Sequence, residues 1–185
     1  KHSTTDNHAG LAISLLGQLS AKDLRDARLE VLNDHLRNTP AKTSGSYYYS
    51  ALLNPRISTE ELTAYKSFFR KVLDEKTAAA YRSQPQLLVE WCIRNIVLND
   101  SLNSQRILMS PEGVWKSGIA DRRSRDIFFV AMARSVGVPA WIDEVTGKVQ
   151  LIGDEGAVDV NFEAMEQASA PTGKFIARYT PIKSL

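Results

Sequence analysis

The stretch from Asp121 to Trp141, which reads DRRSRDIFFVAMARSVGVPAW, constrains the fold of this chain most strongly. Asp121 is a favourable N-cap residue, and Gly137 followed by Pro139 is a typical helix stop. Apolar side chains recur at helical spacing between these two ends. We therefore predict a buried helix that runs directly into a β-strand.

The segments before this stretch are predicted to be mainly helical. Ser20 to Asp23 forms a capping box that opens an amphipathic helix ending near Asn38, and Ser58 to Glu61 forms a second box that opens another helix. The polar segment Lys1 to Gly10 is expected to be a frayed terminus rather than a metal site built on its two histidines. Shorter helical segments are expected at residues 11–19, at residues 76–83 and after Pro85, with a polar break at residues 41–45 and a turn at residues 111–113.

After Gly137 the apolar period changes from 3.6 residues to two, which is typical of strands. The order of elements, helices first and strands last, indicates an α+β fold rather than alternating βαβ units. We predict a helical N-terminal region at residues 1–83 and a core at residues 84–185, in which the central helix packs on a small antiparallel sheet. The pattern leaves open whether the two parts form one compact unit. The predicted strands lie at residues 138–143, 148–152, 157–162 and 174–179.

The composition excludes several classes of protein. Apolar residues make up 43% of the 185 residues and charged residues 24%, as in a soluble globular domain. The net charge of +2 is too small to indicate a nucleic-acid partner. No apolar run approaches the roughly 20 residues that span a bilayer. The chain carries neither a phosphate-binding glycine motif nor zinc-ligand spacing, so no cofactor or metal is expected, and its oligomeric state is left open.

Several reactive side chains are expected to be structural. Cys92 is the single cysteine and lies in the middle of an apolar helix, where burial raises the pKa of a thiol instead of lowering it. His35 lies on or beside the apolar stripe of its helix, so we expect it to pack against the core. Tyr47 to Tyr49 could form a stacking surface for a ligand, but a short turn or helix whose rings cover the core is favoured.

Two segments resemble a known family. The run from Ser110 to Val114 and the segment from Ala131 to Ala140 are similar to the core of the transglutaminase-like superfamily, whose fold is related to that of papain-like cysteine proteases. The resemblance covers roughly residues 84 to 163. With residues 22–26, 29–35 and 54–57, the fuller pattern resembles transglutaminase-like proteins of gut Bacteroides-type bacteria. Those are usually larger secreted or envelope proteins, so the resemblance implies an extracytoplasmic location and a chain that is part of a longer protein, in keeping with its start at Lys1 instead of Met.

The resemblance also implies where a catalytic triad would lie. In the family, a cysteine at the helix N-terminus attacks an acyl group, a histidine on the next strand shares its proton, and an aspartate on the strand beyond orients the imidazole. The cysteine position falls on Arg122, with Asp121, Arg123 and Ser124 as neighbours. The histidine position falls among Val149, Gln150 and Leu151, with Gln150 taken as its match, and the aspartate position falls on Asn161, with Asp159 two residues away.

This sequence departs from the family at the positions that carry chemistry. A guanidinium cannot act as a nucleophile at Arg122, and Ser124 has no adjacent base. We therefore expect a degenerate, noncatalytic cleft. The alternative is an active cysteine-type amidase, peptidase or protein-glutamine acyltransferase whose missing groups come from outside this segment or from another register.

The charged cluster at the helix start allows two interpretations. The favoured one is a network of salt bridges in which the arginines pair with Asp126 and Asp143 and tie the helix to its sheet. The functional one is a groove that binds a carboxylate-bearing peptide or glycan through arginine forks, with Trp115 and Trp141 in its lining. The candidate cleft residues are Asp121, Arg122, Arg123, Ser124, Gln150, Asn161 and Trp115.

Overall fold

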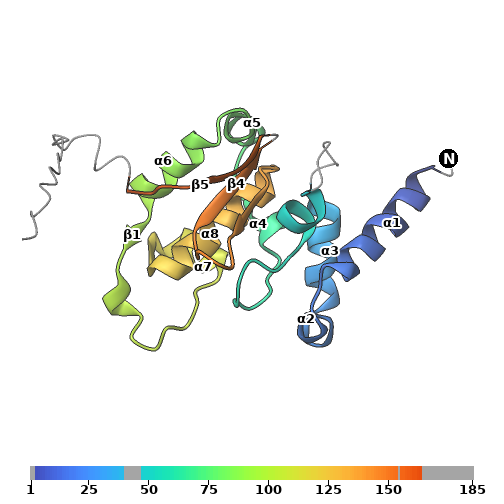
Figure 1. Ribbon diagram of the computed structural model, residues 1–185, viewed down its shortest axis with the longest axis horizontal. Helices are drawn as coiled ribbons and strands as arrows, with labels where there is room; N and C mark the ends of the chain where they lie inside the picture. The colour runs from blue at the N-terminus through green and yellow to red at the C-terminus, as the bar shows by residue number, and fades with distance from the viewer. Residues whose placement is uncertain (1–2, 40–46, 154, 164–185) are drawn as a thin grey trace, which may run out of the picture.

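The computed structural model describes residues 3–39, 47–153 and 155–163, and the predicted break at residues 41–45 and strand at residues 174–179 lie outside them. The described chain has the predicted α+β fold (Figure 1). None of the described helices is both long enough and apolar enough to span a membrane. The elements are α1 (Ser3–Gly17), α2 (Ala21–Asp26), α3 (Leu29–Asn38), η1 (Tyr49–Leu53), α4 (Tyr65–Val72), α5 (Glu75–Ser83), α6 (Gln86–Asn95), β1 (Val97–Leu98), η2 (Asp100–Leu102), α7 (Pro111–Ser117), β2 (Ile119–Ala120), α8 (Arg122–Val136), β3 (Ala140–Ile142), β4 (Val149–Gly153) and β5 (Gly156–Asp159).

Helix α8 is the centre of the fold, as the sequence predicts. Its N-cap is Asp121, whose side chain accepts a hydrogen bond from the backbone amide of Ser124. It ends at Gly137, which adopts the left-handed conformation at φ 94° that few other residues tolerate. From Ser124 onward nearly every residue is buried, because α4, α7 and β3 pack around the helix.

The sheet that covers α8 is antiparallel, with strand order β3-β4-β5. Ala140 pairs with Leu151, and Leu151 pairs with Val158. Side chains alternate between the two faces of a strand, so Ala140 and Leu151 share the face that joins the core around α8. Their neighbours Trp141 and Gln150 point to the opposite face. A separate parallel pair, β1 with β2, was not predicted and lies just before α8.

The hydrophobic core crosses the expected division at residue 83. Tyr65 and Phe69 of α4 and Tyr81 of α5 belong to the same buried cluster as Phe128 and Phe129 of α8. Helices α1 to α3 lie at one end of the molecule, drawn in blue in Figure 1, and join it through a smaller cluster. The described residues before and after residue 83 thus share one core.

Polar groups buried beside this core connect distant segments. The guanidinium of Arg134, only 2% exposed, donates from Nε to the carbonyl oxygen of Ala140 (2.9 Å) and from Nη1 to those of Asn54 (2.7 Å) and Arg56 (2.8 Å). The ammonium of Lys66 donates to the carbonyl oxygen of Leu52 (2.5 Å). Both side chains are therefore held by carbonyl oxygens, and Lys66 also by the Thr39 hydroxyl at 2.6 Å, without a directly bonded carboxylate.

Burial also shifts the pKa values of His35 and Lys66. The ring of His35 is fully buried, packs edge to face on Tyr65 at 4.6 Å, and bonds the carbonyl oxygen of Thr63 through Nε2. Burial, followed by repulsion from Lys66, holds the pKa of His35 well below its usual value. Burial likewise lowers the pKa of Lys66. The packed role predicted for His35 is confirmed.

Local predictions failed in the N-terminal part of the chain. Helix α1 begins at Ser3, so most of the segment assigned to a frayed terminus is helical. The capping box at Ser20 is confirmed, but the predicted helix breaks at Ala27 and Arg28 into α2 and α3, although neither glycine nor proline occurs there.

Two further local patterns were misassigned. The helix predicted after Ser58 is present as α4 but begins only at Tyr65, without the predicted capping box. The carboxylate of Glu60 instead accepts hydrogen bonds from the backbone amides of Ile57 (2.8 Å) and Ser58 (2.7 Å), which keeps this segment out of the helix. The predicted turn at residues 111–113 is instead the start of α7, where the Ser110 hydroxyl accepts the amide of Gly113 and Pro111 occupies the first turn.

Candidate functional site

The start of α8 is closed by two carboxylates. Asp121 accepts hydrogen bonds from the Ser124 amide (3.1 Å), the Ser124 hydroxyl (2.6 Å) and the side-chain amide of Asn103 (2.7 Å). Asp100 accepts the backbone amide of Arg122 at 2.8 Å. Burial would raise the pKa of Asp121, but the bonds from Ser124 outweigh it and lower the pKa. The positive end of the helix dipole is therefore already neutralised by the protein itself.

Ser124 is committed to structure. Its side chain is fully buried, and its hydroxyl donates to Asp121 while accepting the backbone amide of Met109 at 3.0 Å. The bond to Asp121 closes the helix cap, and the bond from Met109 holds the segment before α7 against the helix. Because no imidazole or amine is bonded to it, this hydroxyl has no base that could activate it.

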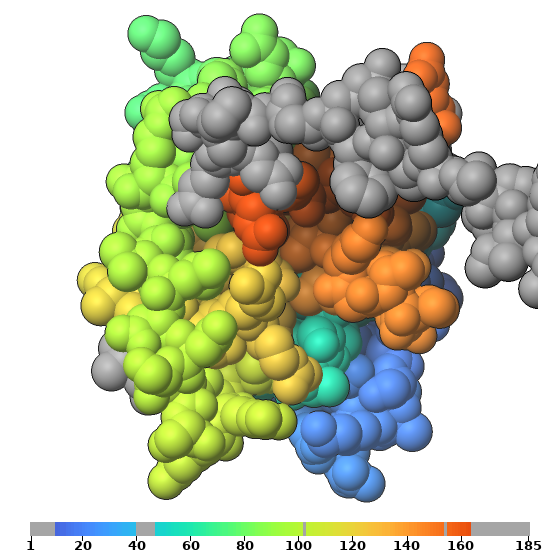
Figure 2. Space-filling model, turned by 60° about the vertical axis from the view of Figure 1, so that its left-hand side comes forward, coloured from blue at the N-terminus to red at the C-terminus, as the bar shows by residue number. Residues whose placement is uncertain are grey.

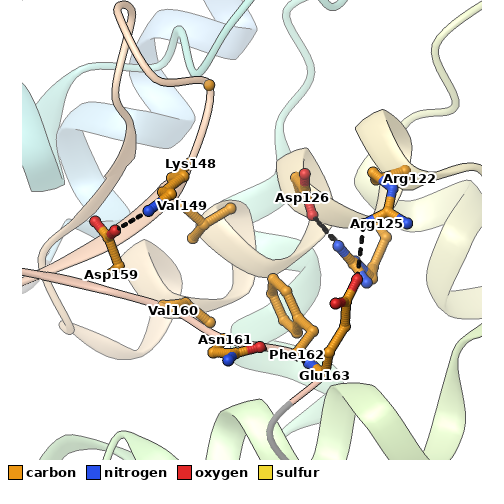
Figure 3. Close-up of a pocket in the computed structure, with 11 residues that line it drawn as sticks. Arg122, Arg125, Asp126, Lys148, Val149, Asp159, Val160, Asn161, Phe162 and Glu163 are labelled. Atoms are coloured by element: carbon orange, nitrogen blue, oxygen red, sulfur yellow. Dashed lines mark hydrogen bonds and ion pairs between the residues drawn. The ribbon is translucent and has the colours of Figure 1, made fainter. Parts of the chain in front are cut away.

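A cleft opens beside this helix start (Figures 2 and 3). It consists of two adjoining hollows. The strand hollow, about 520 Å³, lies between α8 and the end of β5, and the central hollow, about 500 Å³, lies between α8, the segment 57–59 and the β3–β4 turn. Asp126 and Gly147 line both hollows, so these two residues mark the seam between them.

The arginines of α8 take different positions around the cleft. Arg122 is exposed in the strand hollow, where Nη1 lies 3.3 Å from the carboxylate of Glu163. Arg123 is exposed in the central hollow, where Nη2 donates to the Thr59 hydroxyl at 3.2 Å. Neither arginine is held by a buried carboxylate.

Arg125 is held differently, because it is buried in the wall of the strand hollow. Its Nε and Nη2 donate to one oxygen of Asp126, at 3.0 and 2.7 Å, and its guanidinium lies 4.0 Å above the ring of Phe162. Burial raises the pKa of Asp126, with Arg125 opposing the shift. The predicted pairing of the arginine cluster with Asp126 is thus confirmed for Arg125.

The predicted pairing with Asp143 is wrong. One oxygen of Asp143 accepts the backbone amide of Thr146 at 2.7 Å and its hydroxyl at 2.8 Å. An aspartate at the start of a tight turn satisfies its own backbone in this way. Asp143 therefore stabilises the β3–β4 turn, and the arginines meet Glu163 and Thr59 instead.

The three positions assigned to a degenerate triad do not all meet. Arg122 and Asn161 both line the strand hollow, and the Asn161 side chain accepts the backbone amide of Glu163. Gln150 does not line it: its side chain accepts from the indole of Trp141 and donates to Asp159, both at 2.8 Å, on the sheet face turned away from the core. The neighbouring Val149 lines the hollow instead.

The tryptophans lie outside the cleft. Trp115 is stacked on Trp91 at 4.9 Å and meets Phe69 edge to face at 5.9 Å, which makes it part of an aromatic cluster beside the core. Trp141 packs edge to face on Tyr47 at 5.4 Å. Neither ring lines the strand hollow or the central hollow.

Cys92 is buried in α6, as predicted. Its side chain has no exposed surface, and burial raises the pKa of the thiol to about 12. A thiol in this state is protonated at neutral pH and out of reach of a substrate.

Some residues of the cleft escaped the sequence reasoning as site residues. Asp126 could have been found, because it lies three and four residues after Arg123 and Arg122 and therefore on the same side of the helix. Thr59 and Glu163 gave no signal, since they reach the cleft from segments remote in sequence. Among the described residues, no three His, Cys, Asp or Glu side chains are grouped so that they could hold a metal.

Comparison with known proteins does not assign the chain to a family. No protein-family model, no curated protein and no solved structure matches it.

Proposed function

We propose that this chain is a noncatalytic, transglutaminase-like binding module, a pseudoenzyme domain whose cleft holds a carboxylate-bearing peptide or glycan. On the sequence resemblance, we place it in a larger extracytoplasmic protein, periplasmic, outer-membrane-associated or secreted, where it serves binding or assembly. The observation that carries the proposal is the pair of exposed arginines, Arg122 and Arg123, that face two adjoining hollows at the start of α8.

The chemistry of these arginines supports a carboxylate ligand. A guanidinium presents parallel N–H donors that match the two oxygens of a carboxylate. Arg123 donates to a neutral hydroxyl, so its charge remains available to a ligand. Arg122 already meets the carboxylate of Glu163 at 3.3 Å, and both side chains of that pair are more than half exposed. Such a surface pair contributes little to stability, so Arg122 can readily exchange Glu163 for a ligand carboxylate.

The side chains around the cleft support a noncatalytic role. None of the described residues that line the strand and central hollows is a cysteine or a histidine. The positive end of the helix dipole, which activates a thiol in cysteine enzymes, is compensated in this chain by the carboxylates of Asp121 and Asp100. Within this sequence a cysteine mechanism would have to use Cys92, whose thiol is buried and protonated.

Binding can be tested with labelled acidic probes. Fluorescence anisotropy would compare glutamate-containing peptides and oligogalacturonate with their amidated counterparts. We expect at least one acidic probe to bind, and the double variant Arg122→Ala/Arg123→Ala to bind it about tenfold more weakly. Arg94→Ala, which removes an exposed arginine of α6 from a similar surface pair with Glu90, is the matched control and should change nothing. Equal binding of acidic and amidated probes would refute the proposal.

Catalysis is tested in parallel. The protein is incubated with a glutamine-containing acyl-donor peptide and a primary amine, and product is sought by mass spectrometry in wild type and in Cys92→Ser. We expect no product that depends on Cys92. Turnover that disappears in Cys92→Ser would establish the cysteine-enzyme alternative instead.

A further inference from the structure

The cleft continues toward the N-terminal helices. A third hollow, the helical hollow, has a volume of about 370 Å³ and is lined by Lys22 and Arg28, by Glu61 and by Thr59. Thr59 also lines the central hollow. The helical, central and strand hollows therefore follow one another, joined at Thr59 and then at Asp126 and Gly147. Figure 2 looks onto this face, with the start of α8 in yellow, the β3–β4 turn in orange, the segment around residue 59 in teal and α2 in blue.

The wall between the helical and central hollows is rigidly built. Arg56 donates from Nε to Asp23 of α2 at 3.0 Å and from Nη1 to the carbonyl oxygen of Glu60. The Glu60 carboxylate in turn accepts the backbone amides of Ile57 and Ser58. Arg134 fixes the carbonyl oxygen of Arg56 from the other side. A groove with such a wall loses little conformational entropy when a ligand enters.

The central hollow has a floor of three aliphatic side chains, whereas the apolar lining of the strand hollow includes the ring of Phe162. Ile57, Ile127 and Ile142 line the central hollow, and all three belong to or pack against the main core. Arg123 stands at one rim, and Asp143 and Glu144 stand at the other. The hollow therefore suits an aliphatic side chain of a ligand, with a carboxylate on the adjacent residue directed toward Arg123.

The lining favours a peptide over a glycan. A sugar ring is commonly held against an exposed aromatic face. The aromatic ring in the described lining is Phe162, and one of its faces is covered by the Arg125 guanidinium while Phe129 meets it edge to face at 5.1 Å. Trp115 and Trp141 lie elsewhere. Charged rims above an aliphatic floor match the alternating side chains of an extended peptide.

We infer that the ligand is an extended peptide that runs through all three hollows, places one aliphatic side chain in the central hollow and presents an adjacent carboxylate to Arg123. This inference rests on the proposed binding function and narrows its ligand class. The peptide enters as a linear chain because the three hollows are arranged in series and no single one of them encloses a ligand.

The test uses labelled peptides of about eight residues, a length that spans roughly 26–29 Å when extended. The reference peptide carries leucine at its centre beside a glutamate. One companion replaces the glutamate with glutamine, another replaces the leucine with serine, and a third is shortened to the tripeptide glutamate-leucine-glycine. Labelled oligogalacturonate represents the glycan class. Affinities are measured by fluorescence anisotropy for wild type, Arg123→Ala, Thr59→Gln and the control Arg94→Ala.

We expect the reference peptide to bind about tenfold more tightly than either substituted companion. Arg123→Ala should abolish the preference for glutamate over glutamine while keeping the preference for leucine. Thr59→Gln, which narrows the seam between the helical and central hollows, should weaken the eight-residue peptide about fivefold and the tripeptide by less, because the tripeptide meets Thr59 only from the central hollow. Arg94→Ala should match wild type.

Three results would overturn the inference, and they separate it from the proposed function. Peptide binding that is indifferent to the leucine and to Thr59→Gln refutes the extended mode but leaves acidic-ligand binding intact. Binding of oligogalacturonate alone, weakened by Arg123→Ala, refutes the peptide class and likewise leaves the function intact. Binding of neither probe removes the function and the inference together.

Discussion

The two ends of α8 use the same residue type in opposite ways. At the C-terminal end of α8 (the exit), Arg134 is buried and donates to three backbone carbonyl oxygens, the most distant of which is 80 residues away in sequence. At the N-terminal end (the entrance), Arg122 and Arg123 are exposed, and their side chains bond to Glu163 and Thr59, respectively. Arg134 at the exit thus connects distant segments of the fold, whereas the arginines at the entrance leave their charge accessible at the cleft. The surroundings, rather than the residue type, decide whether an arginine is buried as a donor to the backbone or left exposed at a cleft.

The largest effect should come from removing the arginine at the exit. Arg134→Met leaves the carbonyl oxygens of Ala140, Asn54 and Arg56 buried without their donor, and we expect a loss of about 3 kcal/mol or more in the free energy of unfolding. Urea titration followed by circular dichroism measures it. Arg134→Lys keeps the charge but not the fork, so it should recover less than half of the loss. A loss below about 1 kcal/mol would contradict the structural role.

The cap at the entrance should come next. Asp121→Ala removes the acceptor for the Ser124 amide, the Ser124 hydroxyl and the Asn103 amide, and we expect a loss of about 2 kcal/mol. Hydrogen exchange should quicken at residues 103–109, which the cap holds in place. Asp121→Asn, which retains one acceptor oxygen, is the control. If it proves as damaging as alanine, the cap depends on charge rather than on hydrogen bonding.

A pH-dependent effect should follow from His35, which lies beside the exit. Its pKa is depressed in the folded state, so below about pH 6.5 the unfolded chain binds a proton that the folded chain does not. Stability should therefore fall as the pH is lowered from 6.5 to 5, by up to about 1.4 kcal/mol per pH unit. Urea midpoints across this range measure the slope. His35→Gln should flatten it, and an unchanged slope would assign the effect to other groups.

The smallest effect should come from the entrance arginine. Because Arg122 and Glu163 form an exposed pair, Arg122→Ala should change the free energy of unfolding by less than about 0.5 kcal/mol. Arg94→Ala, which removes an exposed arginine from its pair with the half-buried Glu90, provides the reference value. A cost for Arg122→Ala approaching that of Arg134→Met would erase the contrast between the two ends of the helix.

Sequence alone predicted the elements whose signals are local. Helix α8 was found because Asp121 and Gly137 act on their immediate neighbours, and the strands after it were found from their alternating pattern. The irregular segment at Ser58 was missed because the pattern Ser58 to Glu61 fits a capping box, whereas the fold uses Glu60 to bind the amides of Ile57 and Ser58. Arg56 adds contacts to Glu60 and to Asp23, which is remote in sequence. The break between α2 and α3 has no local signal at all.

The candidate site was predicted in part for the same reason. Arg122 and Arg123 were found from the helix start, whereas Thr59 and Glu163 reach the cleft through the tertiary fold. The choice of Gln150 failed to place a cleft residue because a difference of one position on a strand moves a side chain to the other face, and Val149 lies on the cleft side. Which face is buried depends on pairing that one sequence does not reveal.

The bonds of Arg134 have a consequence for synthesis of the chain. The carbonyl oxygen of Asn54 and its donor are 80 residues apart. At about 5–20 residues per second, a ribosome needs roughly 4–16 s to make the second partner after the first. For most of that interval Tyr65 and Phe69 of α4 lack α8, the helix against which they pack in the main core. The nascent chain thus exposes this apolar surface of α4 for several seconds, and it offers a binding site to a holding chaperone.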